Sequence, residues 1–423
     1  MRIVEPITAE ITIDEVDAIQ QAMADPHLSR TFDKRTYEEG NFRQGIVSTS
    51  HGREHRNRRR LENAQFRPDA LKLYEQDLFP PIVEMFVAKA AAAGEADLFS
   101  LGERLAIVLA AKRAGFDFDI DDHEAHEDIV AYVDVFSQGS AIVDAIDPDA
   151  VRQAVKQAYR EFAEQFGKPS VERRSVALAA LEKGEIGEDE LPHDILTALV
   201  RHRHDPEMGL TDDLLVIREA STYLQGGTHT SAQTLVHAVD LLIDSREHHP
   251  EYWERVKTDL AFAQRCMHET IRLRPTTPKA KRRAEEATKI GDLEIPQGAL
   301  VVLDLTRANR DPAVFGEDAE AFNPDRDIPS RMARWGLSFG GGPHICPGRK
   351  VAGGNPQLST KDDLGDEHLY GLVAMMIQSV VRRQPARHPK KPQLIDDRTD
   401  RLTRWKEYWV TFDLSPTHPQ ESP

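Results

Sequence analysis

The chain has 423 residues, of which 40% are hydrophobic and 30% charged, and this composition excludes an intrinsically disordered protein. No stretch approaches the roughly 18 uninterrupted apolar residues of a membrane helix, and acidic residues interrupt the N-terminal stretch where a signal peptide would be apolar, so we expect a cytoplasmic protein without membrane contact. The net charge of −17 argues against broad binding to nucleic acid, and two cysteines are too few for a disulfide scaffold.

Apolar residues recur at spacings of three and four through most of residues 1–270, which predicts a series of helices. After Pro275 the pattern changes to alternation over residues 288–307, around the turn sequence Pro296-Gln297-Gly298. Alternation returns over residues 408–414 near the C-terminus. We therefore predict a mainly α structure with small β-sheets.

No internal repeat and no obvious linker divide the sequence, so we predict a single domain over residues 1–423. Residues 183–193 and 353–368 are rich in turn-forming and acidic residues and are predicted to be loops. Cys266 lies in a predicted helix and is interpreted as a small buried residue.

Residues 212–245 are predicted to form a long helix interrupted by the sequence QGGTHTS. Gly226 and Gly227 lie together in it, and each glycine costs about 1 kcal/mol against alanine in a helix interior. Such a pair favours a kink. The kink marks either a place where another helix crosses or a widened turn beside the hydroxyl group of Thr230.

The sequence FGGGPHICPG at residues 339–348 contains the pattern F-x-x-G-x-H-x-C-x-G. Glycines there allow close approach of the backbone to a flat ligand and leave amide N–H groups free to point at the sulfur of Cys346. A zinc site would need further cysteines or histidines in pairs, and a dinucleotide loop would need a glycine where Ile345 stands. Iron held in a porphyrin by one cysteine agrees with both observations.

This loop resembles the haem-binding signature of the cytochrome P-450 family of haem-thiolate monooxygenases. The resemblance covers most of the chain and implies the family's fold, a helical domain around a buried haem b (iron protoporphyrin IX) with small β-sheets. It also implies that Cys346 is the ligand of the haem iron.

Other marks of the family follow in the expected order. Glu269 and Arg272 lie at i and i+3 in ETIRLRP, so a helix puts both charges on one face. The resemblance implies that Arg326, in FNPDR, joins them in a structural ion triad beneath the cysteine loop.

Haem also brings two carboxylates, which need cationic or hydrogen-bonding partners. The resemblance assigns this role to His55, Arg59, Arg282 and His344, with Arg283 as an alternative to Arg282. The complete set of implied cofactor-binding residues is His55, Arg59, Gly226, Gly227, Arg282, Phe339, His344, Cys346 and Gly348.

Gly226, Gly227, Thr230 and Ser231 match the motif of the family's helix over the iron, in which an acid and an alcohol deliver protons. His229 stands where the family usually has the carboxylate. Histidine titrates near neutrality and can carry a proton, but it does not supply the same negative charge. We expect Thr230 and His229 to be the catalytic residues.

Two segments depart from the family's layout. The predicted propionate-binding helix begins near residue 51, so we expect the N-terminal helix and part of the first sheet to be shortened or absent. After Ala352, the residues Gly353-Gly354-Asn355-Pro356 would stop a helix where the family continues one. We predict that residues 369–383 supply that helix after an inserted loop of about residues 353–368.

The resemblance implies a monooxygenase that hydroxylates or oxidatively dealkylates a small organic substrate with O2. No flavin or iron–sulfur motif is present, so electrons would come from a separate ferredoxin or flavodoxin, docking near Arg331, Arg334, Arg349 and Lys350. Two alternatives stay open: an enzyme of the same family that uses peroxide or rearranges its substrate, and a haem-based sensor without turnover. The sequence does not identify the substrate, and Thr276-Thr277 is a candidate wall of its pocket.

Overall fold

A computed structural model describes residues 7–33, 41–328, 332–357, 364–399 and 404–413. Its α-helices are α1 (Val16–Ala24), α2 (Gly52–Asn63), α3 (Pro68–Leu73), α4 (Phe79–Ala92), α5 (Leu98–Ala114), α6 (His123–Ser140), α7 (Pro148–Phe162), α8 (Lys168–Glu182), α9 (Ile195–Arg201), α10 (Asp213–Ser245), α11 (Pro250–Thr258), α12 (Leu260–Leu273), α13 (Leu305–Ala308), α14 (Pro312–Phe315), α15 (Arg349–Gly353) and α16 (Leu372–Arg382). Its strands are β1 (Glu10–Ile13), β2 (Leu28–Ser29), β3 (Glu95–Asp97), β4 (Lys279–Ala284), β5 (Thr288–Ile290), β6 (Leu293–Ile295), β7 (Leu300–Asp304), β8 (Ala386–Arg387), β9 (Gln393–Ile395) and β10 (Trp405–Thr411).

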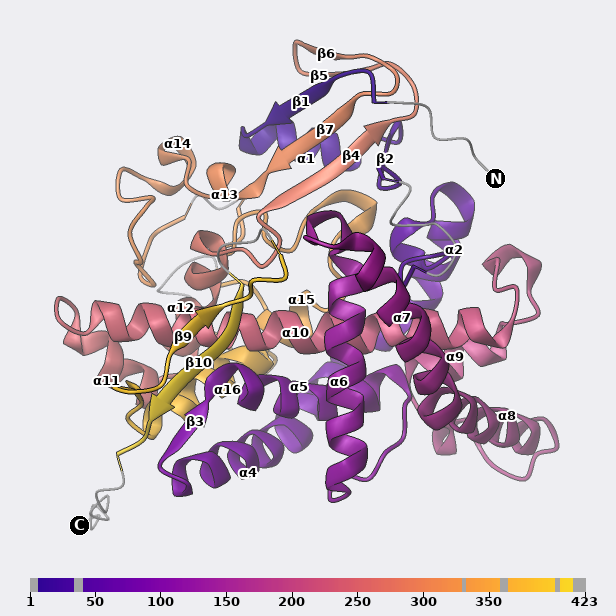
Figure 1. Cartoon of the computed structure of the whole chain (residues 1–423), viewed down its shortest axis with the longest axis horizontal. Helices are drawn as coiled ribbons and strands as arrows, with labels where there is room; N and C mark the ends of the chain where they lie inside the picture. The colour runs from indigo at the N-terminus through magenta and orange to yellow at the C-terminus, as the bar shows by residue number, and fades with distance from the viewer. Residues whose placement is uncertain (1–6, 34–40, 329–331, 358–363, 400–403, 414–423) are drawn as a thin grey trace.

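The prediction of a mainly helical chain with small sheets is confirmed. Helix α10 runs through the middle of the molecule, and most of the other helices lie around it (Figure 1). Its buried face packs against α5, α12 and α16 in one apolar core, which also encloses Cys266. Burial raises the pKa of the Cys266 thiol, so this cysteine is an inert core residue. Within the described residues, no helix has the length and apolarity needed to cross a membrane.

Helix α10 is continuous across Gly226 and Gly227, so the predicted interruption is wrong. The helix is maintained there although several of its hydroxyl groups bind its own carbonyl oxygens four residues back. Thr230 donates to the carbonyl oxygen of Gly226 at 2.7 Å, and Ser231 donates to that of Gly227 at 2.7 Å. Such bonds bend helices without ending them.

The main sheet has the strand order β1-β7-β4-β2 and lies at one side of the helical part (Figure 1). Strand β7 pairs parallel with β1 and antiparallel with β4. The alternating stretch after Pro275 therefore forms strands, as predicted. The turn at Pro296-Gln297-Gly298 does not join two paired strands, because β6 before it pairs with β5 in a separate hairpin. The C-terminal alternation also forms a strand, β10, which pairs with β3, β8 and β9.

The N-terminal helix and part of the first sheet, expected from the sequence to be shortened or absent, are both present in the described part of the chain, so the expected absence is wrong. Helix α1 has nine residues, and β1 and β2 contribute four and two residues to the main sheet.

A helix follows the predicted loop of residues 353–368, as expected, and it is α16. The two ends of this segment are joined, because Asn355 N–H donates to the carbonyl oxygen of Leu369 at 2.7 Å. The side-chain amide of Gln264 on α12 donates to the carbonyl oxygens of Gly353 and Asn355 at the start of the segment and to that of Leu369 after its end. Helix α16 thus continues beside the end of α15, and residues 358–363 of the predicted loop lie outside the described residues.

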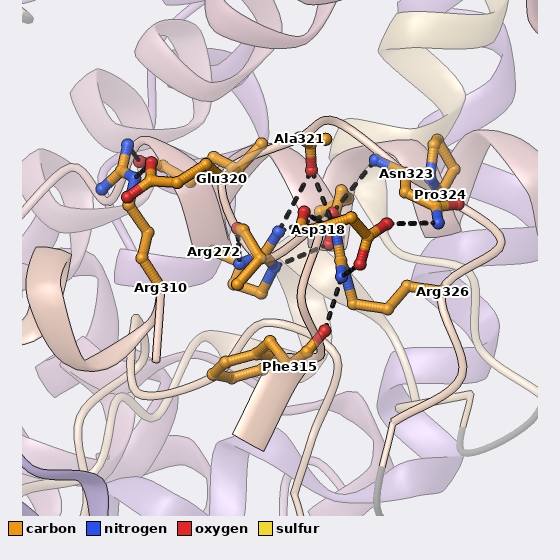
Figure 2. A network of polar contacts seen from close by, with 12 residues as sticks. Arg272, Arg310, Phe315, Asp318, Glu320, Ala321, Asn323, Pro324 and Arg326 are labelled. Atoms are coloured by element: carbon orange, nitrogen blue, oxygen red, sulfur yellow. Dashed lines mark hydrogen bonds and ion pairs between the residues drawn. The ribbon is translucent and has the colours of Figure 1, made fainter. Parts of the chain in front are cut away.

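Glu269, Arg272 and Arg326 form a buried ion network, with each residue at most 3% exposed. Arg272 donates two hydrogen bonds to the Glu269 carboxylate, at 2.7 and 2.8 Å, and Arg326 Nε lies 3.2 Å from the same carboxylate. Arg326 also reaches Asp318 and the carbonyl oxygens of Phe315 and Ala321 (Figure 2). The predicted charges therefore meet in space.

This network is linked to the segment that leads into the cysteine loop. Arg272 donates to the carbonyl oxygen of Asn309 at 2.6 Å. The side chain of Asn309 in turn accepts a hydrogen bond from Leu337 N–H at 2.8 Å and donates to Ser338 at 2.9 Å. Ser338 directly precedes Phe339, so the ion network fixes the start of the loop.

Glu269→Gln is expected to destabilise the fold by about 3–5 kcal/mol, because the substitution leaves the buried guanidinium group of Arg272 without a carboxylate and leaves Arg326 with Asp318 alone. Chemical denaturation followed by circular dichroism measures the change. Glu320→Gln is the matched control, since Glu320 is largely exposed and forms an ion pair with Arg310 in the same region (Figure 2). The control should change the free energy of unfolding by less than about 1 kcal/mol. Equal effects of the two substitutions would contradict a supporting role for the network.

Candidate functional site

A cavity of about 420 Å³ lies between helix α10 and the cysteine loop. Helix α10 contributes Thr230 to its wall, and the cysteine loop contributes Cys346. All nine residues for which the sequence predicts cofactor binding line this one cavity, and they are His55, Arg59, Gly226, Gly227, Arg282, Phe339, His344, Cys346 and Gly348. Segments nearly 300 residues apart in sequence are therefore brought together around the thiol.

The cysteine loop presents the Cys346 thiol through its backbone. Gly342 has a φ of +61°, and a Cβ atom there would lie 2.3 Å from the carbonyl oxygen of Met23 on α1, so only glycine fits. Cys346 N–H donates to the carbonyl oxygen of Phe339 at 2.9 Å, which closes the loop.

Backbone amides stabilise the ionised form of this thiol. Burial raises the pKa of the Cys346 thiol, whereas hydrogen bonds from Gly348 and Arg349 N–H and the positive charges of Arg59 and Arg349 lower it. The described residues contain no cluster of three or more histidine, cysteine or acidic side chains that could hold a metal ion.

Two arginines and two histidines gather at the rim of the same cavity, and burial lowers the pKa of both histidines, that of His55 to about 4. His55 and Arg59 lie on the buried face of α2, and the rings of His55 and His344 are 4.1 Å apart. Arg59 donates to the carbonyl oxygen of Ile345, which joins α2 to the cysteine loop. Arg282 lines the cavity and Arg283 does not, as expected for successive residues of strand β4 that face opposite sides.

Arg30, which follows β2, also lines the cavity, and the sequence analysis missed it. Burial is the main cause that lowers the pKa of Arg30 and that of Arg282, the latter to about 9, with nearby arginines as a further cause. Neither guanidinium has a carboxylate partner among the described residues. No motif surrounds Arg30 in the sequence, so only the packing of β2 against β4 reveals its place.

The cavity fits haem b in its chemistry. Its wall supplies one buried thiol with amide donors for an iron ligand. Arg30 and Arg282 supply buried cations that need anionic partners, which the two propionate groups of haem would provide. Met267, Ile271, Leu372 and Val373 add apolar surface for a porphyrin. Cys346 would hold the iron, and the cationic rim would hold the propionates.

Thr230 and His229 point to different sides of α10. Thr230 is exposed to the cavity, and its hydroxyl donates to the carbonyl oxygen of Gly226. His229 is buried and does not line this cavity; its Nδ1 lies 3.1 Å from Oε1 of Glu103 on α5. Burial and the Arg404 charge lower the pKa of His229 to about 3, and burial is the main cause that raises the pKa of Glu103 to about 8. The sequence gives no signal for Glu103, which is 126 residues away.

A second, polar cavity of about 200 Å³ adjoins the first. The residues that line both cavities are Arg30, Thr230, Thr276, Thr277, Ala280 and Arg282. His229 and Gln233 line only the second cavity. Thr276 and Thr277 thus form part of a pocket wall, and α10 separates two chambers of different polarity.

The cations predicted to surround the cysteine loop are not equally accessible. Arg334 is 3% exposed and donates to the carbonyl oxygens of Pro324 and Gln357, so it is a structural residue and does not contact a partner. Arg349 and Lys350 are partly exposed, and Arg331 lies outside the described residues. Helix α2 adds the exposed Arg56 and other arginines on the face opposite the cavity.

Comparisons with known proteins agree with this geometry. The solved structure of CalO2 matches 95% of this chain and 90% of its own, with a TM-score of 0.70 and 18% sequence identity. The structure of P450BioI in complex with a hexadec-9Z-enoic acid ligated acyl carrier protein matches 95% of this chain and 92% of its own, with a TM-score of 0.70 and 17% identity. These likenesses show the fold.

Curated relatives match over shorter segments. Luteothin monooxygenase of Streptomyces thioluteus is 32% identical over 176 residues, which are 41% of this chain and 40% of that protein. Methyltetrahydroprotoberberine 14-monooxygenase of Papaver somniferum is 28% identical over 192 residues, 39% of this chain and 36% of that protein. The chain thus spans 40% or less of the length of these two relatives.

The sequence model of the Cytochrome P450 family matches residues 8–357, well over half of the chain. The matched segment includes the cysteine loop, the ion network and the glycine pair of α10. Members of this family bind haem, in agreement with the thiol and the cationic rim of the large cavity. The chain belongs to the cytochrome P450 family.

Proposed function

We propose that the protein is a monooxygenase that inserts one oxygen atom of O2 into a small organic substrate, by hydroxylation or oxidative dealkylation. The observation that carries this proposal is the position of Thr230, a hydroxyl-bearing residue that lines the same cavity as Cys346. A protein that only binds haem has no need of a hydroxyl group on that wall. The names of two curated relatives, both monooxygenases, support the same reaction class.

Haem held by Cys346 would supply the oxygen chemistry, with the thiolate donating electron density that favours cleavage of the O–O bond. The protein's own residues have three tasks. The amides of Gly348 and Arg349 favour the ionised thiol and so oppose the effect of its burial, which raises the thiol pKa while shielding the sulfur from water. Arg30, Arg59 and Arg282 neutralise the propionates. The hydroxyl group of Thr230 donates a proton at the cavity wall formed by α10. Thr230 receives this proton from His229, from water or from both.

Electrons have to reach the site from a separate protein, for which we propose a ferredoxin or flavodoxin. Such partners are acidic and fit a basic face. The exposed arginines of α2 and the partly exposed Arg349 and Lys350 form this face, because α2 contacts the cysteine loop through Arg59 and Ile345.

Turnover with labelled oxygen tests the proposed function. Compounds are first screened for the spectral change that marks substrate binding near the haem iron, and a positive compound is then incubated with a surrogate ferredoxin, its reductase and isotopically labelled O2. We expect product that carries one labelled atom. Product formed with peroxide alone, and none with O2 and reductase, would favour the peroxide-using alternative. Binding without product under either condition would favour a sensor.

Thr230→Ala is expected to lower the fraction of electrons that end in product by about tenfold or more, because a positioned proton donor is removed from the cavity wall. The ratio of product to consumed reductant measures this coupling. Thr228→Ala is the matched control, since Thr228 also donates to a carbonyl oxygen four residues back but is buried and does not line the cavity. Equal coupling of both variants would contradict a role of Thr230 in proton delivery.

Arg282→Met is expected to speed the loss of haem to an acceptor protein by about 10- to 100-fold, because one charge-assisted hydrogen bond to a propionate disappears. The transfer is followed by absorbance. Arg283→Met serves as the control, because this neighbour on β4 is also buried but does not line the cavity. If Arg283→Met loses haem as fast as Arg282→Met, the proposed propionate contact of Arg282 is wrong.

A further inference from the structure

A buried pair of titratable side chains joins α5 to α10 directly behind Thr230. Nδ1 of His229 lies 3.1 Å from Oε1 of Glu103, and each residue is 7% exposed. The ring edge of His229 also packs against Phe99, with ring centroids 5.1 Å apart. Helices α5 and α10 pack closely against each other, so this pair has a fixed place in the fold.

The pair carries no net charge at neutral pH. Burial raises the pKa of Glu103 to about 8, and burial lowers the pKa of His229 to about 3, so the carboxyl group is protonated and the imidazole is neutral. The charged groups that act on the pair are Asp134 on α6, Arg104 on α5, and Asp396, Arg398 and Arg404 before β10. Asp134 is paired with Arg398 at 2.7 Å, and Asp396 with Arg404 at 3.0 Å, so these groups largely compensate one another.

The other nitrogen of the imidazole is left without a partner. Nε2 of His229 is buried and makes no hydrogen bond within the described residues. A protonated Glu103 donates to Nδ1, so the hydrogen of the neutral ring must lie on Nε2. His229 and Thr230 both line the polar side cavity, which adjoins the large cavity. Nε2–H is therefore a buried donor without a partner, on a side chain that lines the same side cavity as Thr230.

We propose that Glu103 and His229 form a proton relay that supplies Thr230. Nε2 of His229 releases its proton to water in the polar side cavity, and the carboxyl proton of Glu103 moves to Nδ1. The pair is then a carboxylate beside an imidazole with hydrogen on Nδ1. A proton from solvent returns to Nε2 as the Nδ1 hydrogen returns to Glu103, so each cycle moves one proton and no electron.

The carboxyl group that the family's motif places one residue before the threonine is thus contributed here by α5. His229 connects it to α10, because an imidazole carries a proton between its two nitrogens. This inference rests on the proposed function, since a relay has a purpose only if the protein consumes protons during turnover. Glu103 is a positioning residue and proton store, because it acts through His229.

Glu103→Gln separates the relay from a structural role. Glutamine keeps the size of the side chain and can still donate a hydrogen bond to Nδ1, but it has no proton to pass on. We expect the coupling of electrons to product in Glu103→Gln to fall by about tenfold or more while the binding of the spin-shifting compound changes little. Glu127→Gln is the matched control, because Glu127 pairs with Arg104 across α5 and α6 away from the cavities.

The pH profile provides a further test. Wild-type coupling should fall as the pH rises through about 8, because the carboxyl proton of Glu103 is present below its pKa and is lost above it. Glu103→Gln should remove this dependence. A purely structural contact predicts wild-type coupling in Glu103→Gln at every pH, and that result would overturn the relay.

The ring tautomer gives a readout that does not depend on turnover. In the diamagnetic reduced carbon monoxide complex with nitrogen-labelled histidine, the signals absent from His229→Gln identify His229. We expect hydrogen on Nε2 in wild type and in Glu103→Gln. Hydrogen on Nδ1 in wild type would mean an ionised Glu103 and would overturn the relay. Wild type that forms no product overturns the proposed function together with the relay, whereas a fully coupled Glu103→Gln overturns the relay alone.

Discussion

The burial of the Cys346 sulfur, which would have to carry negative charge to hold iron, is the constraint on which the structure depends. Burial alone would protonate Cys346, and the amides of Gly348 and Arg349 oppose this because the loop turns them toward the sulfur. The loop can take this course only with glycine at position 342, where the backbone of α1 is too close for any side chain. Its start is fixed through Asn309 by the buried ion network. Helix α1, the ion network and Asn309 thus all support the loop that carries Cys346.

Helix α10 divides the space above this thiol by polarity. Its Thr230 face borders the large cavity with apolar and cationic walls, and His229 faces a buried carboxyl group on α5. Both residues border the polar side cavity. Consecutive residues of a helix point in directions about 100° apart, so one turn of α10 can border both cavities and also contact α5.

The residues whose roles depend on local spacing were predictable from the sequence. The cysteine loop, the pair Glu269 and Arg272, and the pair His55 and Arg59 lie within one turn or one loop each, and the structure brings all of them to the expected places. The helical character of the chain was predictable for the same reason. Their roles in holding a cofactor stay predictions.

The features that depend on packing between distant segments were not predictable. Arg30 and Glu103 have no motif around them, and their places follow from the packing of β2 on β4 and of α5 on α10. The continuity of α10 across its glycines depends on its buried neighbours, which outweigh the low helix propensity. The sequence predicts an exposed cation at Arg334, but the side chain is buried and donates hydrogen bonds to two carbonyl oxygens.

The absorption spectrum of the reduced carbon monoxide complex tests the central claim most directly. If Cys346 binds the haem iron as a thiolate, the wild-type protein gives the strongly red-shifted band of thiolate ligation, and Cys346→Ser loses it while Cys266→Ser keeps it. The account is contradicted if the wild-type protein lacks the band or if Cys346→Ser retains it.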